Sequence, residues 1–230
     1  MVSALPTAGA LPAVGAAPLM GALAASVAQQ PSTIAPGPER LRSGEVHVVL
    51  TTALGRIDLA VDTVNAPVTG ANFLRYVDGG LYAGGTFYRA VTRANQPDDS
   101  VRIEVVQGGM DRARRSEAFP PIPLEGTAQT GLRHLDGTVS MARGAPDTAR
   151  AEFFICIGDQ PSLDQGGARN PDGRGFAAFG RVLSGMDVVR AIQARPADGQ
   201  YLTDRVVIEG ATRTNGDAAR GPNPPEDSRQ

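Results

Sequence analysis

Residues 45–62 have the sequence EVHVVLTTALGRIDLAVD, in which two runs of alternating apolar residues flank a turn. The alternating residues are Val46, Val48 and Leu50 before Leu54-Gly55-Arg56, and Ile57, Leu59 and Val61 after it. A period of two is typical of strands, because successive side chains of a strand point to opposite faces of the sheet. The stretch therefore predicts an antiparallel hairpin.

The sequence that follows predicts further short strands and two helices. Asn65-Ala66-Pro67 supplies a helix start, and Gly79-Gly80 ends a run of apolar residues at roughly helical spacing. A second helix is predicted over residues 186–194. The remaining apolar runs lie between turn residues, at 86–91, 101–106, 137–141, 153–157, 176–182 and 205–208. Many short strands of this kind are typical of a β-sandwich or a β-barrel.

The composition excludes several classes of protein. Glycine and proline supply 28 and 18 of the 230 residues, which disfavours an all-helical fold. All 22 basic residues are arginines, so Schiff-base chemistry, a lysine nucleophile and a P-loop lysine are excluded. The net charge is −2 and the two signs are interspersed along the chain, so we expect no nucleic-acid partner.

The cysteine and histidine content argues against disulfide and metal chemistry. Cys156 is the only cysteine, and with His47 and His134 it cannot assemble a usual Cys/His zinc site. Cys156 lies in the apolar run 153–157 and is interpreted as a buried, inert thiol. The alternative is a nucleophile activated by His134, which would make the protein a hydrolase.

The N-terminal part of the chain differs in composition from the rest. Residues 1–44 are dominated by Ala, Pro, Gly and Leu, and we interpret them as a signal peptide followed by a linker. The motif Ser26-Val27-Ala28 suits cleavage before Gln29. Against this interpretation, no basic residue lies near Met1 and three prolines interrupt the segment, which favours a flexible leader or a wrongly assigned start.

These boundaries predict one domain over residues 45–210, followed by a polar, disordered tail over residues 211–230. The leader predicts a periplasmic or secreted protein with no stable membrane insertion after processing. A cytoplasmic location is the alternative.

Five blocks of sequence resemble, in order, the signature blocks of the cyclophilins, which are peptidyl-prolyl cis-trans isomerases. The blocks are TFYRAV at 86–91, VVQGG at 105–109, GTVSMAR at 137–143, EFFIC at 152–156 and FAAFGRV at 176–182. Five blocks in the family's order are far more specific than any one of them. The resemblance implies an all-β fold, a closed eight-stranded antiparallel barrel capped by two α-helices, with the active site on its outer face.

The resemblance also implies which residues act on a prolyl bond. Arg89 occupies the position of the family's catalytic arginine, and Gln107 that of a residue that hydrogen-bonds the substrate backbone. The pocket for the proline ring is implied at Val105, Phe154, Leu163 and Phe176, and the segment that binds the extended peptide at Ala142 and Arg143. Because strand side chains alternate, we expect Phe153 and Phe154 to face opposite sides, one into the barrel and one outward. The resemblance implies that Phe154 is the one at the site.

Some positions depart from the family pattern. Glu104 stands where an apolar pocket residue is common, so it either contacts the substrate or pairs with Arg89. Residues 92–102 and 164–175 are two insertions that we expect to flank the substrate groove. His134 matches a structural histidine of the family and is expected to be buried and hydrogen-bonded.

The sequence thus predicts a prolyl isomerase that assists protein folding, free of metal and cofactor, in which Arg89 is the electrostatic catalyst. Its expected partners are unfolded or extended proline-containing polypeptides, and it is expected to act as a monomer. The alternative function is a cyclophilin-fold module that binds proline-containing segments, as a chaperone or scaffold, with little turnover. Glu104 and Arg143 keep that alternative open.

Overall fold

The structure is a computed structural model that describes residues 40–96 and 100–214. The strands are β1 (Glu45–Thr52), β2 (Gly55–Asp62), β3 (Thr86–Val91), β4 (Val105–Gly109), β5 (Thr138–Met141), β6 (Phe153–Cys156), β7 (Ala177–Ser184), β8 (Ala197–Asp198) and β9 (Tyr201–Arg213). The helices are α1 (Pro67–Asp78), α2 (Thr127–Thr130) and α3 (Met186–Gln193), with 3₁₀ turns η1 (Arg112–Glu117) and η2 (Pro161–Leu163).

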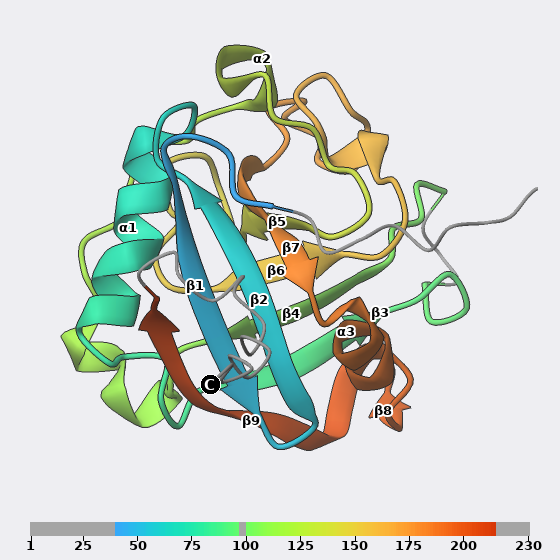
Figure 1. Cartoon of the computed structure of the whole chain (residues 1–230). Coiled ribbons are helices and arrows are strands. Elements are labelled where there is room, and N and C mark those ends of the chain that lie inside the picture. The colour runs from blue at the N-terminus through green and yellow to red at the C-terminus, as the bar shows by residue number, and fades with distance from the viewer. Residues whose placement is uncertain (1–39, 97–99, 215–230) are drawn as a thin grey trace, which may run out of the picture. The chain divides into compact units, whose positions relative to one another are not determined.

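Eight of these strands close into an antiparallel barrel (Figure 1). Hydrogen-bonded neighbours follow the order β1-β2-β7-β5-β6-β4-β3-β9, and a further pairing of β9 with β1 completes the circle. The short strand β8 pairs only with β9, within the part of the chain that the structure describes. The predicted eight-stranded barrel is confirmed, and the β1–β2 hairpin turns where the sequence predicts it.

The structure differs most from the predicted boundaries at strands β4 and β9 and at the C-terminal end of the domain. Strand β4 begins at Val105 rather than at residue 101, because residues 101–104 are irregular and lead from the insertion 92–102 into the strand. Strand β9 extends from Tyr201 to Arg213, so the sheet enters the segment 211–230 that is predicted as a tail. The predicted leader falls mostly on residues 1–39, which lie outside the described residues, as do residues 215–230.

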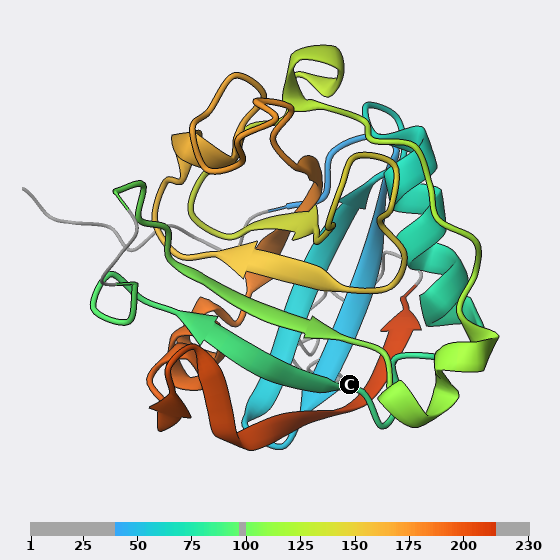
Figure 2. The same ribbon diagram turned by 180° about the vertical axis from the view of Figure 1, so that it is seen from behind.

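The helices α1 and α3 lie at opposite ends of the barrel, as the two views of Figures 1 and 2 show. Pro67 opens α1, where its missing N–H costs no hydrogen bond, and the N–H of Gly79 bonds back to Arg75 at the end. Both predicted helices are therefore confirmed, and α2 adds one short turn that the periodicity does not predict. Among the described residues, no helix is both long and apolar enough to cross a membrane.

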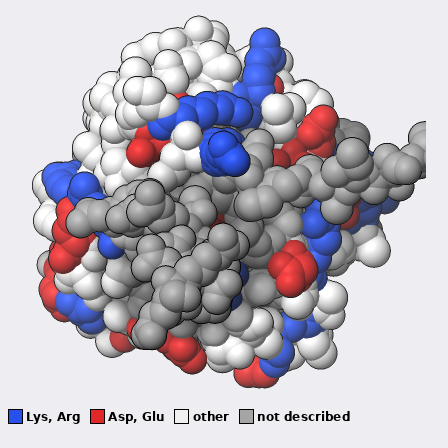
Figure 3. Space-filling view, viewed as in Figure 1, with Lys and Arg blue, Asp and Glu red and all other residues white. Residues whose placement is uncertain are grey.

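Aromatic rings fill the centre of the barrel. The ring of Phe73 on α1 lies 5.0 to 5.5 Å, between centroids, from the rings of Tyr82, Phe153 and Phe179. All four side chains are fully buried, so they join the helix to the inner face of the sheet. On the face shown in Figure 3, acidic and basic side chains of the described residues are interspersed.

Candidate active site

A β-bulge in β3 places two neighbouring side chains on the outer face of the barrel. Phe87 pairs with Gly108 and Arg89 pairs with Gln107, so Tyr88 is the extra residue of the bulge. Phe87 points into the core, whereas Tyr88 and Arg89 are both partly buried on the outside. Strict alternation would put Tyr88 and Arg89 on opposite faces, which is why sequence analysis misses Tyr88.

The guanidinium of Arg89 is held by two glutamine side chains. Its Nη1 donates to Oε1 of Gln107 at 2.8 Å, and its Nε donates to Oε1 of Gln200 at 3.0 Å, with Nη2 donating to the same Gln200 oxygen. Within residues 40–96 and 100–214, these bonds engage three of the five N–H groups of Arg89. Burial lowers the pKa of Arg89, yet an arginine in this setting remains a cation.

Gln107 links Arg89 to Tyr88. Its Oε1 accepts from Arg89, and its Nε2 donates to the hydroxyl of Tyr88 at 2.7 Å, so both ends of the amide are fixed. Burial raises the pKa of Tyr88 to about 12, so this hydroxyl is neutral at physiological pH. The contact of Gln107 with a substrate backbone stays a prediction, and the described residues engage only one of its two amide N–H groups.

Gln200 has no motif that would identify it from the sequence. It lies in the turn between β8 and β9, and its backbone carbonyl accepts from the N–H of Ala90 on β3. Its Nε2 also donates to the carbonyl of Asn95, in the first insertion. The barrel thus brings a side chain 111 residues away in sequence onto Arg89.

The predicted pocket residues form an apolar cluster separate from the barrel core. Phe154 packs with Val105 and Leu163, and Phe176 and Ala142 border the cluster. The ring of Phe176 stands edge-on to Phe154, with centroids 5.3 Å apart. Phe153 belongs to the barrel core instead, which confirms that the two phenylalanines face opposite sides of β6.

His134 is buried and packs against Phe154 of this cluster. Its ring stacks on Phe154 with centroids 6.0 Å apart, its Nδ1 contacts Asp164 at 2.7 Å, and its Nε2 contacts Ser140 at 2.9 Å. Burial lowers the pKa of His134. The predicted structural role is confirmed, since His134 is 1% exposed and Ser140 is 0% exposed, which leaves no route for a substrate to this trio.

The hydrolase alternative is wrong. Cys156 is buried inside the pocket cluster, and burial raises the pKa of its thiol well above the usual value. Both ring nitrogens of His134 are already engaged by Asp164 and Ser140, so His134 does not activate the thiol. Within the described part of the chain, no group of three or more His, Cys, Asp or Glu side chains could hold a metal ion.

Glu104 does not pair with Arg89, contrary to one of the two predictions for it. Its carboxylate lies 3.1 Å from Nε of Arg93, an exposed residue of the first insertion. Gln107 and Gln200 already hold the Arg89 guanidinium, and Arg93 supplies the cation for Glu104 instead. Glu104 lies at the edge of the pocket cluster, directly before Val105, and its contact with a substrate stays a prediction.

Arg143 has a structural task that the sequence does not predict. Its guanidinium donates to the carbonyl of Gly175 at 2.6 and 2.8 Å and to the Asp172 carboxylate at 2.8 and 3.0 Å, and its side chain is 1% exposed. It also lies over the ring of Phe176, at 5.2 Å. Arg143 therefore fastens the insertion 164–175 against the pocket cluster, and peptide binding through the backbone of Ala142 and Arg143 stays a prediction.

The two insertions contact each other. Arg169 of the second insertion donates from Nη1 to the carbonyl of Val101 in the first, at 2.8 Å, and its N–H bonds to the carbonyl of Ser162. Insertions that are 68 residues apart in sequence therefore form one wall. This wall continues to the pocket residues through Arg143 and to Arg89 through Asn95 and Gln200.

The comparison with protein families and curated proteins finds a consistent set of relatives. Residues 47–213 match the family model described as cyclophilin type peptidyl-prolyl cis-trans isomerase/CLD. Peptidyl-prolyl cis-trans isomerase A of Dickeya dadantii is 37% identical over 162 residues, which cover 70% of this chain and 78% of the relative. Peptidyl-prolyl cis-trans isomerase B of Escherichia coli is 32% identical over 163 residues, covering 67% of this chain and 93% of the relative.

The comparison with solved structures finds the same fold. A cyclophilin type peptidyl-prolyl cis-trans isomerase of Cryptosporidium parvum, solved in the presence of the dipeptide Ala-Pro, superposes with a TM-score of 0.59 at 19% identity. The match covers 74% of this chain and 99% of that one. At this level of identity, the likeness concerns the arrangement of strands and helices.

Proposed function

This chain belongs to the cyclophilin family of peptidyl-prolyl cis-trans isomerases, and we propose that it accelerates rotation about X-Pro bonds through Arg89. The observation that carries the proposal is the double anchoring of the Arg89 guanidinium by Gln107 and Gln200, beside an apolar pocket. Its substrates are unfolded or extended polypeptides that contain proline.

Prolyl isomerisation makes and breaks no covalent bond. An X-Pro amide faces a rotation barrier of roughly 18–20 kcal/mol because resonance makes its C–N bond partly double. In the twisted amide the prolyl nitrogen becomes pyramidal and regains a lone pair, so a fixed hydrogen-bond donor near that nitrogen stabilises the transition state more than either planar state. Each tenfold acceleration requires about 1.4 kcal/mol of such preference.

The site supplies both the hydrogen-bond donor, on Arg89, and an apolar surface for the proline ring. Two N–H groups of Arg89 remain after Gln107 and Gln200 are satisfied by the described residues, and the planar cation cannot turn without breaking three hydrogen bonds. Phe154, with Leu163 and Phe176, gives an apolar wall against which the proline ring can be held while the preceding residue rotates.

Isomerisation of a short Ala-Pro peptide by the full chain, followed by NMR exchange, tests the proposal. Acceleration of exchange supports it. Binding of the peptide without acceleration would contradict it and favour the alternative of a binding module. One argument for that alternative has weakened, because Glu104 pairs with Arg93 rather than with Arg89, and the Arg143 side chain is held by Asp172.

Gln200 is proposed as a positioning residue for Arg89. Gln200→Ala removes the acceptor for Nε and Nη2, so we expect kcat to fall about tenfold while KM for the peptide changes little. Gln193→Ala is the matched control. Gln193 is likewise bonded to β3, but there its Nε2 donates to the carbonyl of Val91 rather than accepting from Arg89. An equal fall of kcat in both variants would point to a general loosening of the barrel and contradict the assignment.

The location and the assembly state follow as proposals from the sequence. We propose export to the periplasm or medium, with cleavage before Gln29, and action as a monomer. Mass spectrometry of the mature protein from a fractionated culture tests the first. A mature chain that begins at Met1 would contradict export, and a mass of two chains in solution scattering would contradict the monomer.

A further inference from the structure

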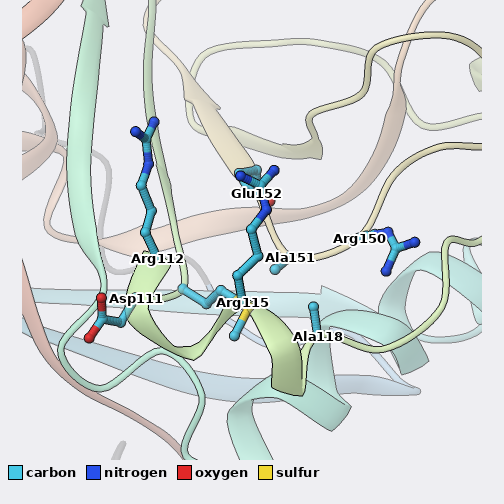
Figure 4. A pocket seen from close by; sticks show the side chains of 8 residues that line it. Asp111, Arg112, Arg115, Ala118, Arg150, Ala151 and Glu152 are labelled. Carbon is cyan, nitrogen blue, oxygen red and sulfur yellow. The ribbon is translucent and has the colours of Figure 1, made fainter.

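Two cavities adjoin each other on the outer surface beside β3 and β4. The larger, of about 280 Å³, lies between η1 and the residues that lead into β6, and the smaller is about 80 Å³. Met110, Asp111, Arg112 and Glu152 line both cavities, so they form one continuous trough. Figure 4 shows Arg112 and Arg115 rising together from η1, with Arg150 on the other side of Glu152.

Positive charge dominates this trough. Arg112, Arg115 and Arg150 line the larger cavity and Arg205 lines the smaller, whereas the acidic residues are Asp111 and Glu152. We call this set of four arginines the arginine trough. Asp111 is already engaged, since its Oδ1 accepts from the N–H of Ala113 to cap η1.

None of the four guanidinium groups forms an ion pair within the residues that the structure describes. Arg112 lies over the ring of Tyr88 at 5.5 Å, and Arg150 donates from Nη1 to the carbonyl of Phe119 at 3.1 Å. These contacts orient the two side chains without neutralising them. Most other arginines on the barrel face a carboxylate, as Arg114 does with Glu117 and Arg213 with Asp78.

The trough begins where the proposed active site ends. Tyr88 lines the smaller cavity, and the Arg112 guanidinium lies over its ring. The Tyr88 hydroxyl accepts from the amide of Gln107, which also accepts from Arg89. An unbroken line of contacts thus runs from Arg89 through Gln107 and Tyr88 to Arg112. An extended peptide advances about 3.3 Å per residue, so a residue a few positions from a proline held beside Arg89 is within reach of the trough if the chain runs along this line.

We propose that the arginine trough binds an acidic side chain of the substrate, so that this isomerase prefers prolyl bonds with an aspartate or glutamate a few residues away. The proposal rests on the proposed function and names the substrate class of the same site. A guanidinium binds a carboxylate through paired, charge-assisted hydrogen bonds. Glu152 opposes the incoming carboxylate and therefore sets how strong the preference is.

The test compares pairs of peptides that differ in one residue. Each peptide carries Ala-Pro, with glutamate or glutamine placed at each of three positions on either side, and kcat/KM is measured by NMR exchange with the full chain. We expect glutamate at one or two of these positions to raise kcat/KM about fivefold over glutamine, and the ratio to fall towards one as salt is raised.

Variants assign the preference to the trough. Arg112→Gln with Arg115→Gln is expected to bring the glutamate-to-glutamine ratio close to one while leaving kcat/KM for the glutamine peptide within twofold. Glu152→Gln is expected to increase the ratio. Arg190→Gln, on α3 and paired with Asp136, removes a charge away from the trough and is expected to leave the ratio unchanged.

Three results would overturn the proposal. These are a ratio of one for the parent at all six positions, a ratio unchanged in the double variant, or an equal fall in Arg190→Gln. Failure of the isomerase function itself is distinguishable, because it would abolish turnover of the glutamine peptides as well. In that case, NMR titration of the glutamate and glutamine peptides still measures whether the trough prefers the acidic one.

Discussion

Arg89→Ala is expected to lower kcat/KM for an Ala-Pro peptide about a hundredfold, the loss typical of removing one preorganised donor from an active site. The guanidinium is the only cation that both glutamines hold, and the described residues leave two of its N–H groups for substrate. The fall should appear mainly in kcat, because the donor acts on the twisted amide more than on the planar one. NMR exchange or a protease-coupled assay measures it.

Arg89→Lys distinguishes charge from geometry. Lysine keeps the positive charge but offers a compact ammonium in place of a planar fork, so it cannot satisfy Gln107 and Gln200 together. We expect it to recover less than a tenth of the lost activity. A lysine variant as active as the parent would mean that the positive potential alone suffices, and that the anchoring by the two glutamines has no part in catalysis.

Arg93→Ala is the control for this series. Arg93 is exposed and pairs with Glu104 in the first insertion, close to Arg89 in sequence but outside its hydrogen-bond network. Loss of its charge tests whether any nearby arginine would do. We expect activity within twofold of the parent and an unchanged melting temperature, since exposed ion pairs contribute little. A large loss in Arg93→Ala would show that Arg89 is not the specific catalyst.

Much of the fold follows from local patterns in the sequence. The alternation across residues 45–62 predicts the hairpin of β1 and β2, and Pro67 and Gly79 mark the two ends of α1. The alternation of strand side chains also predicts that Phe153 and Phe154 face opposite sides of β6, and the family block assigns Phe154 to the outer side. In each of these cases the deciding interaction lies within a few residues along the chain, so the sequence carries it.

The parts of the site that sequence analysis misses depend on contacts between distant residues. Gln200 reaches Arg89 only because the turn after β8 lies beside β3. The Arg143 side chain pairs with Asp172 only because the second insertion folds back on the pocket cluster. Tyr88 requires the bulge opposite Gln107, and a bulge leaves no mark in residue types. Partners chosen by tertiary packing cannot be inferred from spacing.

Phe154→Leu is expected to lower kcat/KM about tenfold through a weaker hold on the proline ring. Leucine keeps an apolar side chain but loses the flat surface that stacks on His134 and meets the edge of Phe176. The loss should appear mainly as a higher KM, because an apolar wall binds the planar and twisted forms of the substrate about equally. Steady-state kinetics with a series of Ala-Pro concentrations measures the two parameters.

Phe153→Leu provides the comparison that separates catalysis from stability. The two phenylalanines are neighbours on β6 and both are buried, but Phe153 packs against Phe73, Tyr82 and Phe87 in the barrel core. Both leucine variants should lose about 1–2 kcal/mol of unfolding free energy, measured by denaturant titration. If Phe153→Leu raised KM as much as Phe154→Leu, the effect would come from a disturbed barrel, and the outer cluster around Phe154 would not be the ring pocket.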